Sequence, residues 1–253
     1  MARTRTTLTV LRTERLTPHL IRVWFGGPGF ADYQTNEFTD QYVKFLFPRE
    51  GGEVMRTYTI RKVDAEKGEL AADFVTHGDE GIAGPWAAAA QPGETLSLLG
   101  PGGAYAPRAD ADWHLLAGDE SAIPAIASAL EAMAPTAVGR VFLEVSGPED
   151  KLPLDKPEGV ELTWLERGDR APGELLAATV RNAPWDSGNV QVFMHGEAHA
   201  IMHDLRRYIR RERTVSAEWA QSISGYWRRG HTEEGFRVWK QELAEAESVP
   251  NPA

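Results

Sequence analysis

Two different patterns divide the chain near residues 101–107, where Pro and Gly cluster. Before this stretch, short segments rich in Val, Leu, Thr and aromatic residues are separated by Gly, Pro or Asp, and one Ala-rich segment looks helical. After it, strand-like and helix-like segments alternate. Closely spaced short strands predict a small antiparallel barrel, whereas the alternation predicts parallel strands with crossover helices. We therefore expect a six-stranded barrel domain over residues 1–107 and an α/β domain over 108–253.

The expected elements can be placed by residue number. In the barrel half, strands are expected at 6–13, 20–25, 41–47, 55–63, 69–76 and 95–99, with a helix at 85–90. In the second half, strands are expected at 113–117, 138–145, 160–165 and 190–194, and helices at 121–133, 173–180, 197–213 and 233–246. The last helix would form a C-terminal extension. Its Phe236, Trp239 and Leu243 share one face, which is typical of plain packing.

Composition restricts the chemistry that this protein can perform. The 253 residues include no cysteine, which excludes disulfides, thiolate zinc sites, iron–sulfur clusters and a cysteine nucleophile. The formal net charge of −10 argues against nucleic-acid binding. No apolar run has the length of a membrane span, and the N-terminus lacks the apolar core of a secretory signal. We expect a cytoplasmic monomer without membrane insertion.

The hexapeptide at residues 56–61, Arg-Thr-Tyr-Thr-Ile-Arg, is typical of a β-strand. Side chains two apart share a strand face, so Arg56 and Tyr58 point the same way. A guanidinium fork suits a phosphate and a flat ring suits a stacked heterocycle, which together indicate a phosphate-bearing aromatic cofactor. The alternative is a half-exposed edge strand with an ordinary Arg and Tyr. Thr59 and Arg61 lie on the opposite face, and we expect Arg61 to be structural.

A glycine-rich turn follows the fifth expected strand and precedes the Ala-rich helix. The turn begins at His77, and glycines at 78, 81 and 84 would let a pyrophosphate approach the backbone closely. Pro85 near the helix start leaves neighbouring N–H groups free for an anion. The alternative is a turn followed by an ordinary helix start. His77 has no second His or carboxylate at metal-ligand spacing, so we expect no metal site.

Two turns in the second half come where a parallel strand ends and a helix begins, which is where doubly wound sheets bind nucleotides. The first is Gly-Asp-Glu-Ser-Ala-Ile-Pro at 118–124. Asp119 and Glu120 would repel a phosphate, so they could instead cap the helix and leave Ser121 and the amides for a ligand. The second turn, at 193–198, leads into a helix whose arginines at 206–213 are either solvated or meet a phosphate. The roles of these arginines stay open.

The stretch Ser-Gly-Tyr-Trp-Arg-Arg-Gly at 224–230 combines two aromatic residues, two arginines and flanking glycines. We expect a loop that forms a lid or wall near a flat cofactor.

Taken together, these motifs resemble the siderophore-interacting protein family of flavin-dependent ferric-siderophore reductases, a branch of the ferredoxin–NADP reductase-like superfamily. The resemblance covers nearly the whole chain and depends on the order of several short motifs. Two departures stand out: Gly-Ile-Ala replaces the usual Gly-Pro-Ala at 81–83, and the Trp often found before Gly196 is absent. The motifs that carry the resemblance are Gln-Tyr-Val-Lys at 41–44, the hexapeptide, Asp-Phe-Val-Thr-His-Gly at 73–78, 118–126, Gly-Glu at 196–197 and Gly-Tyr-Trp-Arg at 225–228.

The resemblance implies FAD as cofactor and NADPH or NADH as electron donor. Arg56 would pair with the FAD pyrophosphate, Tyr58 would pack against the flavin or its ribityl chain, and Thr59 would lie near the reactive edge. The remaining implied residues are His77, Gly78, Gly81, Ala83, Gly84 and Trp86 around FAD, Asp119, Ser121, Ala122 and Glu197 around the nicotinamide nucleotide, Tyr226 and Trp227 beside the cofactor, and Lys44, Arg228 and Arg229 for an anionic ferric siderophore.

The implied reaction is hydride transfer from NAD(P)H to FAD, followed by reduction of Fe(III)-siderophore and release of Fe(II) for intracellular iron acquisition. The alternatives are a flavoprotein that takes electrons from a ferredoxin and a non-catalytic siderophore- or flavin-binding protein. The choice between NADPH and NADH stays open. Ser146 at the end of the second parallel strand has no adjacent Arg to grip a 2′-phosphate, and Glu144 could accept a hydrogen bond from a ribose hydroxyl.

Overall fold

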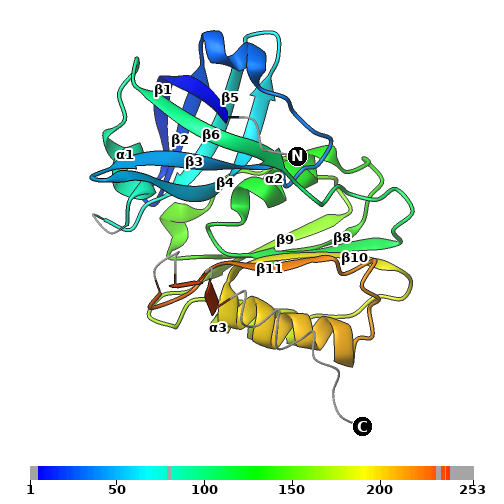
Figure 1. Cartoon of the computed structure of the whole chain (residues 1–253). Helices are drawn as coiled ribbons and strands as arrows, with labels where there is room; N and C mark the ends of the chain where they lie inside the picture. The colour runs from blue at the N-terminus through cyan, green and yellow to red at the C-terminus, as the bar shows by residue number, and fades with distance from the viewer. Residues whose placement is uncertain (1–4, 79–80, 232–234, 237, 240–253) are drawn as a thin grey trace.

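The computed structural model describes residues 5–78, 81–231, 235–236 and 238–239. Figure 1 shows an antiparallel barrel above a parallel sheet with helices. The barrel is closed in the order β1-β2-β5-β4-β3-β6, and the second sheet has the order β11-β10-β7-β8-β9. Both halves of the predicted fold are therefore confirmed, while the domain boundary at 107/108 stays a prediction.

The barrel surrounds a core of phenylalanines that its strands point inward. Phe25, Phe45 and Phe74 are fully buried. Helix α1 covers one end of this core, because its Trp86 ring stacks 6.1 Å from Phe25 and lies 5.4 Å from Phe47. The barrel elements are β1 (Arg5–Thr17), β2 (Leu20–Gly26), the short 3-10 helix η1 (Pro28–Asp32), β3 (Tyr42–Arg49), β4 (Gly52–Asp64), β5 (Glu69–Val75), α1 (Ala83–Ala89) and β6 (Thr95–Gly102).

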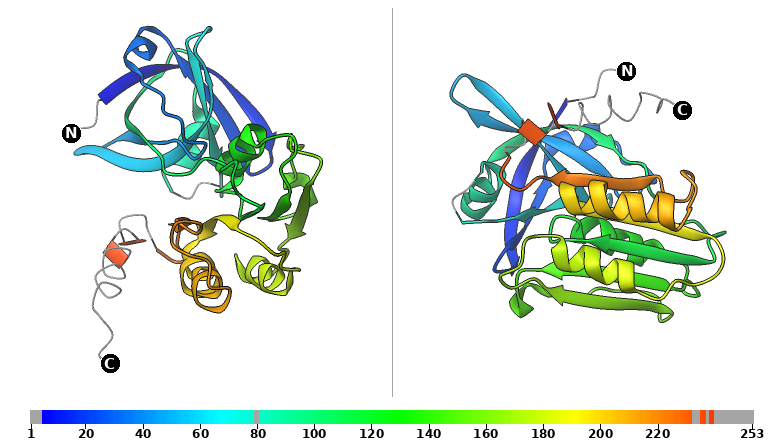
Figure 2. Two further views of the ribbon diagram at one scale, coloured as in Figure 1. Left: turned by 90° about the vertical axis from the view of Figure 1, so that its right-hand side faces the viewer. Right: turned by 90° about the horizontal axis from the view of Figure 1, so that it is seen from below.

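The second half is a five-stranded sheet in which all pairings are parallel. Helix α2 packs on the face toward the barrel, and α3 with the helix that follows β10 covers the other face (Figures 1 and 2). The elements are β7 (Trp113–Gly118), α2 (Ile123–Ala132), β8 (Gly139–Val145), the short 3-10 helix η2 (Pro148–Asp150), β9 (Val160–Glu166), α3 (Glu174–Asn182), β10 (Val190–Glu197), the π-helical segments η3 (His199–Leu205) and η4 (Tyr208–Glu212), and β11 (Ser222–Trp227).

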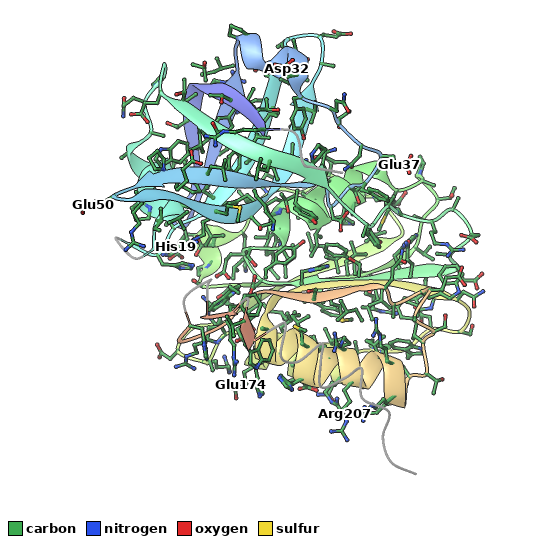
Figure 3. All side chains as sticks on the ribbon, in the orientation of Figure 1. His19, Asp32, Glu37, Glu50, Glu174 and Arg207 are labelled. Atoms are coloured by element: carbon green, nitrogen blue, oxygen red, sulfur yellow. The ribbon has the colours of Figure 1, made fainter. Side chains whose placement is uncertain are left out.

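Polar contacts fix the barrel against the sheet. Arg61 of β4 donates to Glu131 of α2, with Nη1 2.9 Å from Oε2, so its structural position agrees with the expectation. His19, labelled in Figure 3 at the lower edge of the barrel, has its Nδ1 2.8 Å from the buried Asp150 carboxylate. The orientation of the two halves is therefore held by polar side-chain contacts as well as by packing.

One element differs in kind from the sequence expectation. The stretch expected as a loop at 224–230 begins as strand β11, which extends the sheet beside β10. Its Ile, Tyr and Trp favour a pleated backbone, but Gly225 obscured that pattern in the sequence. Most of the helix expected at 233–246 falls outside the described residues, although Phe236 and Trp239 do pack against the sheet core.

No helix in the part of the chain that the structure describes is both long and apolar enough to cross a membrane.

Candidate functional site

A cleft of about 730 Å³ lies between the barrel and the carboxyl ends of the parallel strands. It receives side chains from both sheets and from the turns that the sequence singled out. Among the residues expected to form a site, those that line it are Lys44, Arg56, Tyr58, Thr59, His77, Gly81, Ala83, Gly84, Asp119, Ser121, Tyr226 and Trp227.

Strand β4 reaches the cleft with both of its faces. Tyr58 lies on the face toward the barrel core, and its ring centroid is 4.4 Å from that of Phe74. Thr59 lies on the opposite face, is buried, and forms a side-chain hydrogen bond with Tyr226 of β11. The side chains of β4 therefore alternate between its two faces as expected. Tyr58 and Thr59 nevertheless both line the cleft, because the cleft extends around the strand. Burial raises the pKa of the Tyr226 hydroxyl, which stays neutral at this junction.

The glycine-rich turn supplies a close backbone wall. A Cβ at Gly84 would lie 3.0 Å from the carbonyl oxygen of Val75, so α1 packs tightly on β5 at this position. Gly81 has φ of +80°, and a Cβ there would have no atom of the described residues within 4 Å apart from its chain neighbours. A left-handed φ favours glycine, and the space that a side chain would occupy stays open beside the cleft. With the guanidinium of Arg56 and the ring of Tyr58, these glycines form a cradle that fits a dinucleotide flavin.

Asp119 joins the ends of three parallel strands on the other wall. Its Oδ2 accepts hydrogen bonds from the Glu197 amide at 2.8 Å and from Trp227 Nε1 at 2.7 Å. Its Oδ1 accepts from the amide and the hydroxyl of Ser121, at 3.0 and 2.5 Å. Helix α2 has no side-chain hydrogen bond at its N-cap, Ala122. The expectation that Asp119 caps this helix is therefore wrong, since its oxygens hold the turn and the neighbouring strands instead.

The buried position of Asp119 makes the site sensitive to pH. Burial, aided by the Glu120 carboxylate, raises the pKa of Asp119 to about 6, while the bonds from Ser121 and Trp227 lower it. We expect a component of Trp227 fluorescence to titrate with a midpoint near pH 6, measured as the difference between wild type and Trp227→Phe.

The same shift has a definite sign for stability. Because the pKa in the folded protein exceeds the unfolded value, the stabilising contribution is present below about pH 4 and is lost as the pH rises through about 6. The free energy of unfolding should therefore fall more from pH 4 to 7 in wild type than in Asp119→Asn. Parallel pH profiles for the two proteins would contradict this assignment.

Glu120 and Glu144 have structural partners that the sequence did not reveal. Glu120 is buried and pairs with Arg167, with Oε1 3.1 Å from Nη2. Glu144 has no exposed surface and accepts from the amides of Gly173 and Leu176, at 2.7 and 3.0 Å, at the start of α3. The suggested role of Glu144 as a ribose acceptor is therefore wrong, because its side chain has no exposed surface and its oxygens hold the start of α3.

Several residues expected at the site lie outside the cleft wall. Trp86 packs against barrel rings, Ala122 is in the core around α2, and Glu197 Oε2 accepts from the Ala200 amide at 3.0 Å. Gly78 is exposed, in the turn after β5.

Most of the basic residues expected to contact the siderophore lie elsewhere. Arg228 and Arg229 follow Trp227, but the Arg228 guanidinium lies over the Trp239 ring, 4.2 Å from its centroid. Of the three expected siderophore contacts, only Lys44 lines the cleft. The arginine-rich helix contributes no lining residue among the described ones, and Arg207, labelled in Figure 3, points away from the barrel.

The structure also adds lining residues that sequence reasoning missed. His195 is buried at the end of β10, with its Nε2 2.9 Å from Ser222 Oγ and its ring 4.4 Å from that of Tyr226. Asp40 accepts from the amides of Ala104 and Tyr105, both at 2.9 Å. The position of His195 at a strand end was the only available signal. Asp40 had none, since its partners are more than sixty residues away.

A barrel and a parallel sheet that meet at such a cleft define a protein with the ferredoxin reductase-like fold. A ferredoxin NADP+ reductase from Neisseria gonorrhoeae, solved with bound FAD and NADP, shares this fold with a TM-score of 0.64 at 16% identity, over 81% of this chain and 90% of that one.

Within that fold class, the chain belongs to the siderophore-interacting protein family. Residues 111–230 match the siderophore-interacting protein model, and 9–54 and 49–105 match the siderophore-interacting FAD-binding domain. An uncharacterised protein of Mycobacterium tuberculosis is 51% identical over 94% of this chain and 95% of its own length. The ferric vibriobactin reductase of Vibrio cholerae is 34% identical over 90% of this chain and 91% of its length.

A second reductase and a solved structure are also similar to this chain. The NADPH-dependent ferric-chelate reductase of Escherichia coli is 30% identical over 79% of this chain and 85% of its length. The crystal structure of a siderophore utilization protein from T. fusca has a TM-score of 0.82 at 36% identity, covering 92% of this chain and 95% of that one.

Proposed function

We propose that this protein is an FAD-dependent reductase that takes electrons from a nicotinamide dinucleotide and reduces the ferric iron of a siderophore. The main support is the cleft itself, whose walls are strand β4 of the barrel on one side and the β7–α2 turn of the sheet on the other. Relatives named as ferric reductases support the reaction class. When bound, FAD supplies the chemistry that links a two-electron donor to one-electron reduction of iron.

The barrel wall would hold the cofactor. Arg56 is half-buried at the cleft, where its guanidinium can pair with a pyrophosphate, and the glycines of residues 81–84 let phosphate oxygens approach the backbone. Tyr58 lines the cleft beside Phe74, where its ring would pack against the cofactor. These residues bind and orient, while the aromatic cluster behind them keeps water out of this end of the cleft.

The sheet wall would bind the nicotinamide dinucleotide. The turn around Ser121 lies at the carboxyl end of β7, which is where such sheets bind nucleotides. The hydrogen bond between Thr59 and Tyr226 ties the two walls together next to the expected reaction centre. Asp119 keeps Trp227 and the Glu197 amide in place, so it acts as a positioning residue rather than a reactant.

Anaerobic mixing tests the proposal. The purified protein should show a flavin spectrum that bleaches with NADH or NADPH and recovers with a ferric siderophore. Bleaching with neither dinucleotide but with reduced ferredoxin would establish the ferredoxin-dependent alternative. Flavin that no donor reduces would indicate a binding protein, and bleaching without recovery by the iron complex would rule out the substrate.

Lys44 gives a separate prediction for the iron step. Lys44 lines the cleft on a chain of formal net charge −10, so it is a favourable contact for an anionic chelate. Lys44→Ala should raise the KM for ferric siderophore by about threefold to tenfold, the loss of roughly 1 kcal/mol of attraction, with the dinucleotide step unchanged. Lys62→Ala is the control, because Lys62 is exposed on β4, the partner strand of the same hairpin, and does not line the cleft. Equal effects of the two variants would remove Lys44 from the substrate path.

A further inference from the structure

The order of the parallel sheet indicates where the adenosine half of a dinucleotide would lie. From β7 the chain continues to β8 and β9 on one side, then crosses to β10 and β11 on the other. In sheets of this order the dinucleotide crosses the crevice beside the first strand, and its adenosine ribose is read at the end of the second strand. Here the second strand is β8, which ends at Val145, directly before Ser146.

An enclosed charged cluster occupies that position. Ser146 Oγ accepts from Arg167 Nη2 at 2.6 Å and donates to Glu120 Oε1 at 2.9 Å. Arg167 follows the neighbouring strand β9, and it also contacts Glu120 at 3.1 and 3.3 Å and Glu144 at 3.4 Å. The Arg167 side chain is only 13% exposed, and those of Glu120 and Glu144 are 9% and 0% exposed.

The charges in this cluster do not favour a phosphate. One guanidinium faces two buried carboxylates, so the cluster carries a net negative charge. A 2′-phosphate on the ribose would have to take Arg167 away from Glu120 and leave that carboxylate buried beside Asp119 without its cation. A free 2′-hydroxyl is itself uncharged and needs only a hydrogen-bond acceptor, and carboxylate and serine oxygens suit it.

Two other cations near this edge are differently placed. Lys151 is paired with Glu166, with Nζ 2.5 Å from Oε1. Arg170 is exposed, and its Nη1 contacts the carbonyl oxygen of Arg167 at 3.5 Å. Both lie outside the enclosed cluster, where solvent and salt screen their attraction for a phosphate.

We infer that the cluster of Glu120, Ser146 and Arg167 forms the adenosine-ribose subsite and selects an unphosphorylated ribose, so that NADH is the preferred electron donor. The inference rests on the proposed use of a nicotinamide dinucleotide. It sets this chain apart from the Escherichia coli relative, whose name specifies NADPH.

Binding of dinucleotide fragments tests the subsite without any turnover. By calorimetry, 5′-AMP should bind the purified full-length protein at least about tenfold more tightly than 2′,5′-ADP, which adds only the 2′-phosphate. Glu120→Gln keeps the side-chain shape but removes one negative charge, so 2′,5′-ADP should bind about tenfold more tightly while 5′-AMP changes less than about threefold. Glu161→Gln is the matched control, because it removes the same charge near the opposite end of β9.

The outcomes separate this inference from the proposed function. If 2′,5′-ADP binds wild type as tightly as 5′-AMP, or if neither fragment binds, the subsite is wrong even where both dinucleotides bleach the flavin. An equal effect of Glu120→Gln and Glu161→Gln would also overturn it. If neither dinucleotide bleaches the flavin, yet 5′-AMP is preferred and Glu120→Gln removes that preference, the subsite stands and the proposed electron donor fails.

Discussion

Arg56→Ala protein is expected to purify with little or no FAD. The Arg56 side chain lines the cleft, half-buried, and its Nη1 donates to the Met55 carbonyl at 2.9 Å, which directs the guanidinium along the strand. A charge-assisted bond to a phosphate contributes about 1.5–3 kcal/mol, so its loss should weaken FAD binding by roughly tenfold to 150-fold. The measurement is the flavin-to-protein absorbance ratio, with the Kd of the reconstituted protein by fluorescence.

Two further variants make this result specific. Arg56→Lys keeps the charge but not the planar fork, so it should retain an intermediate amount of FAD. Arg49→Ala should retain FAD fully, because Arg49 is exposed near the tip of the same β3–β4 hairpin, next to Glu50 labelled in Figure 3, and does not line the cleft. Full flavin occupancy in Arg56→Ala would show that the pyrophosphate is held elsewhere.

Gly118→Ala is expected to destabilise the sheet half by about 3 kcal/mol. A Cβ at Gly118 would lie 2.4 Å from the Ala122 Cβ and 2.7 Å from the His195 carbonyl oxygen. Neither atom is the end of a flexible side chain, so the β7–α2 turn must move away from β10. That movement would also strain the bond from the Glu197 amide to Asp119. Urea unfolding measures the loss of stability. The rate at which NADH or NADPH reduces the flavin reports whether the displaced turn still supports the reaction.

The control is the same substitution after the next strand. The three atoms nearest to a Cβ at Gly147 would all belong to the Glu149 carboxylate, at 3.0 to 3.2 Å, and this side chain can swing away. Gly147→Ala should therefore cost less than about 0.5 kcal/mol. Equal costs at the two positions would mean that the turn after β7 adapts freely, and that its close packing does not shape the site.

The sequence motifs that the structure brings to the cleft are contiguous ones. The hexapeptide at residues 56–61 and the turn at 118–124 both reach the cleft, because a strand and a strand-to-helix turn are set by neighbouring residues. The loop expected at 224–230 begins as strand β11, since its pairing with β10 is not visible in a glycine-containing stretch. The cofactor roles of these residues stay predictions that the variants above test.

The sequence did not show which side chains pair with the charged groups. No cation stands next to Ser146 in the chain, yet Arg167 reaches it from the neighbouring strand, 21 residues later. Asp119 was expected to act locally as a helix cap, but it accepts a hydrogen bond from Trp227, 108 residues away. In both cases the order and register of parallel strands decide which side chains meet.

By itself the sequence determined the two folding patterns, the order of nearly all strands and helices, and the motifs that carry the family resemblance. These depend on local backbone preference and side-chain periodicity, which neighbouring residues encode. Only the tertiary structure decided that β4 reaches the cleft with both faces, that Trp86 closes the barrel core, and that Glu120 neutralises Arg167 at the end of the sheet. These features arise where segments distant in the chain are brought together, and local periodicity specifies a face but not the residue that will lie against it.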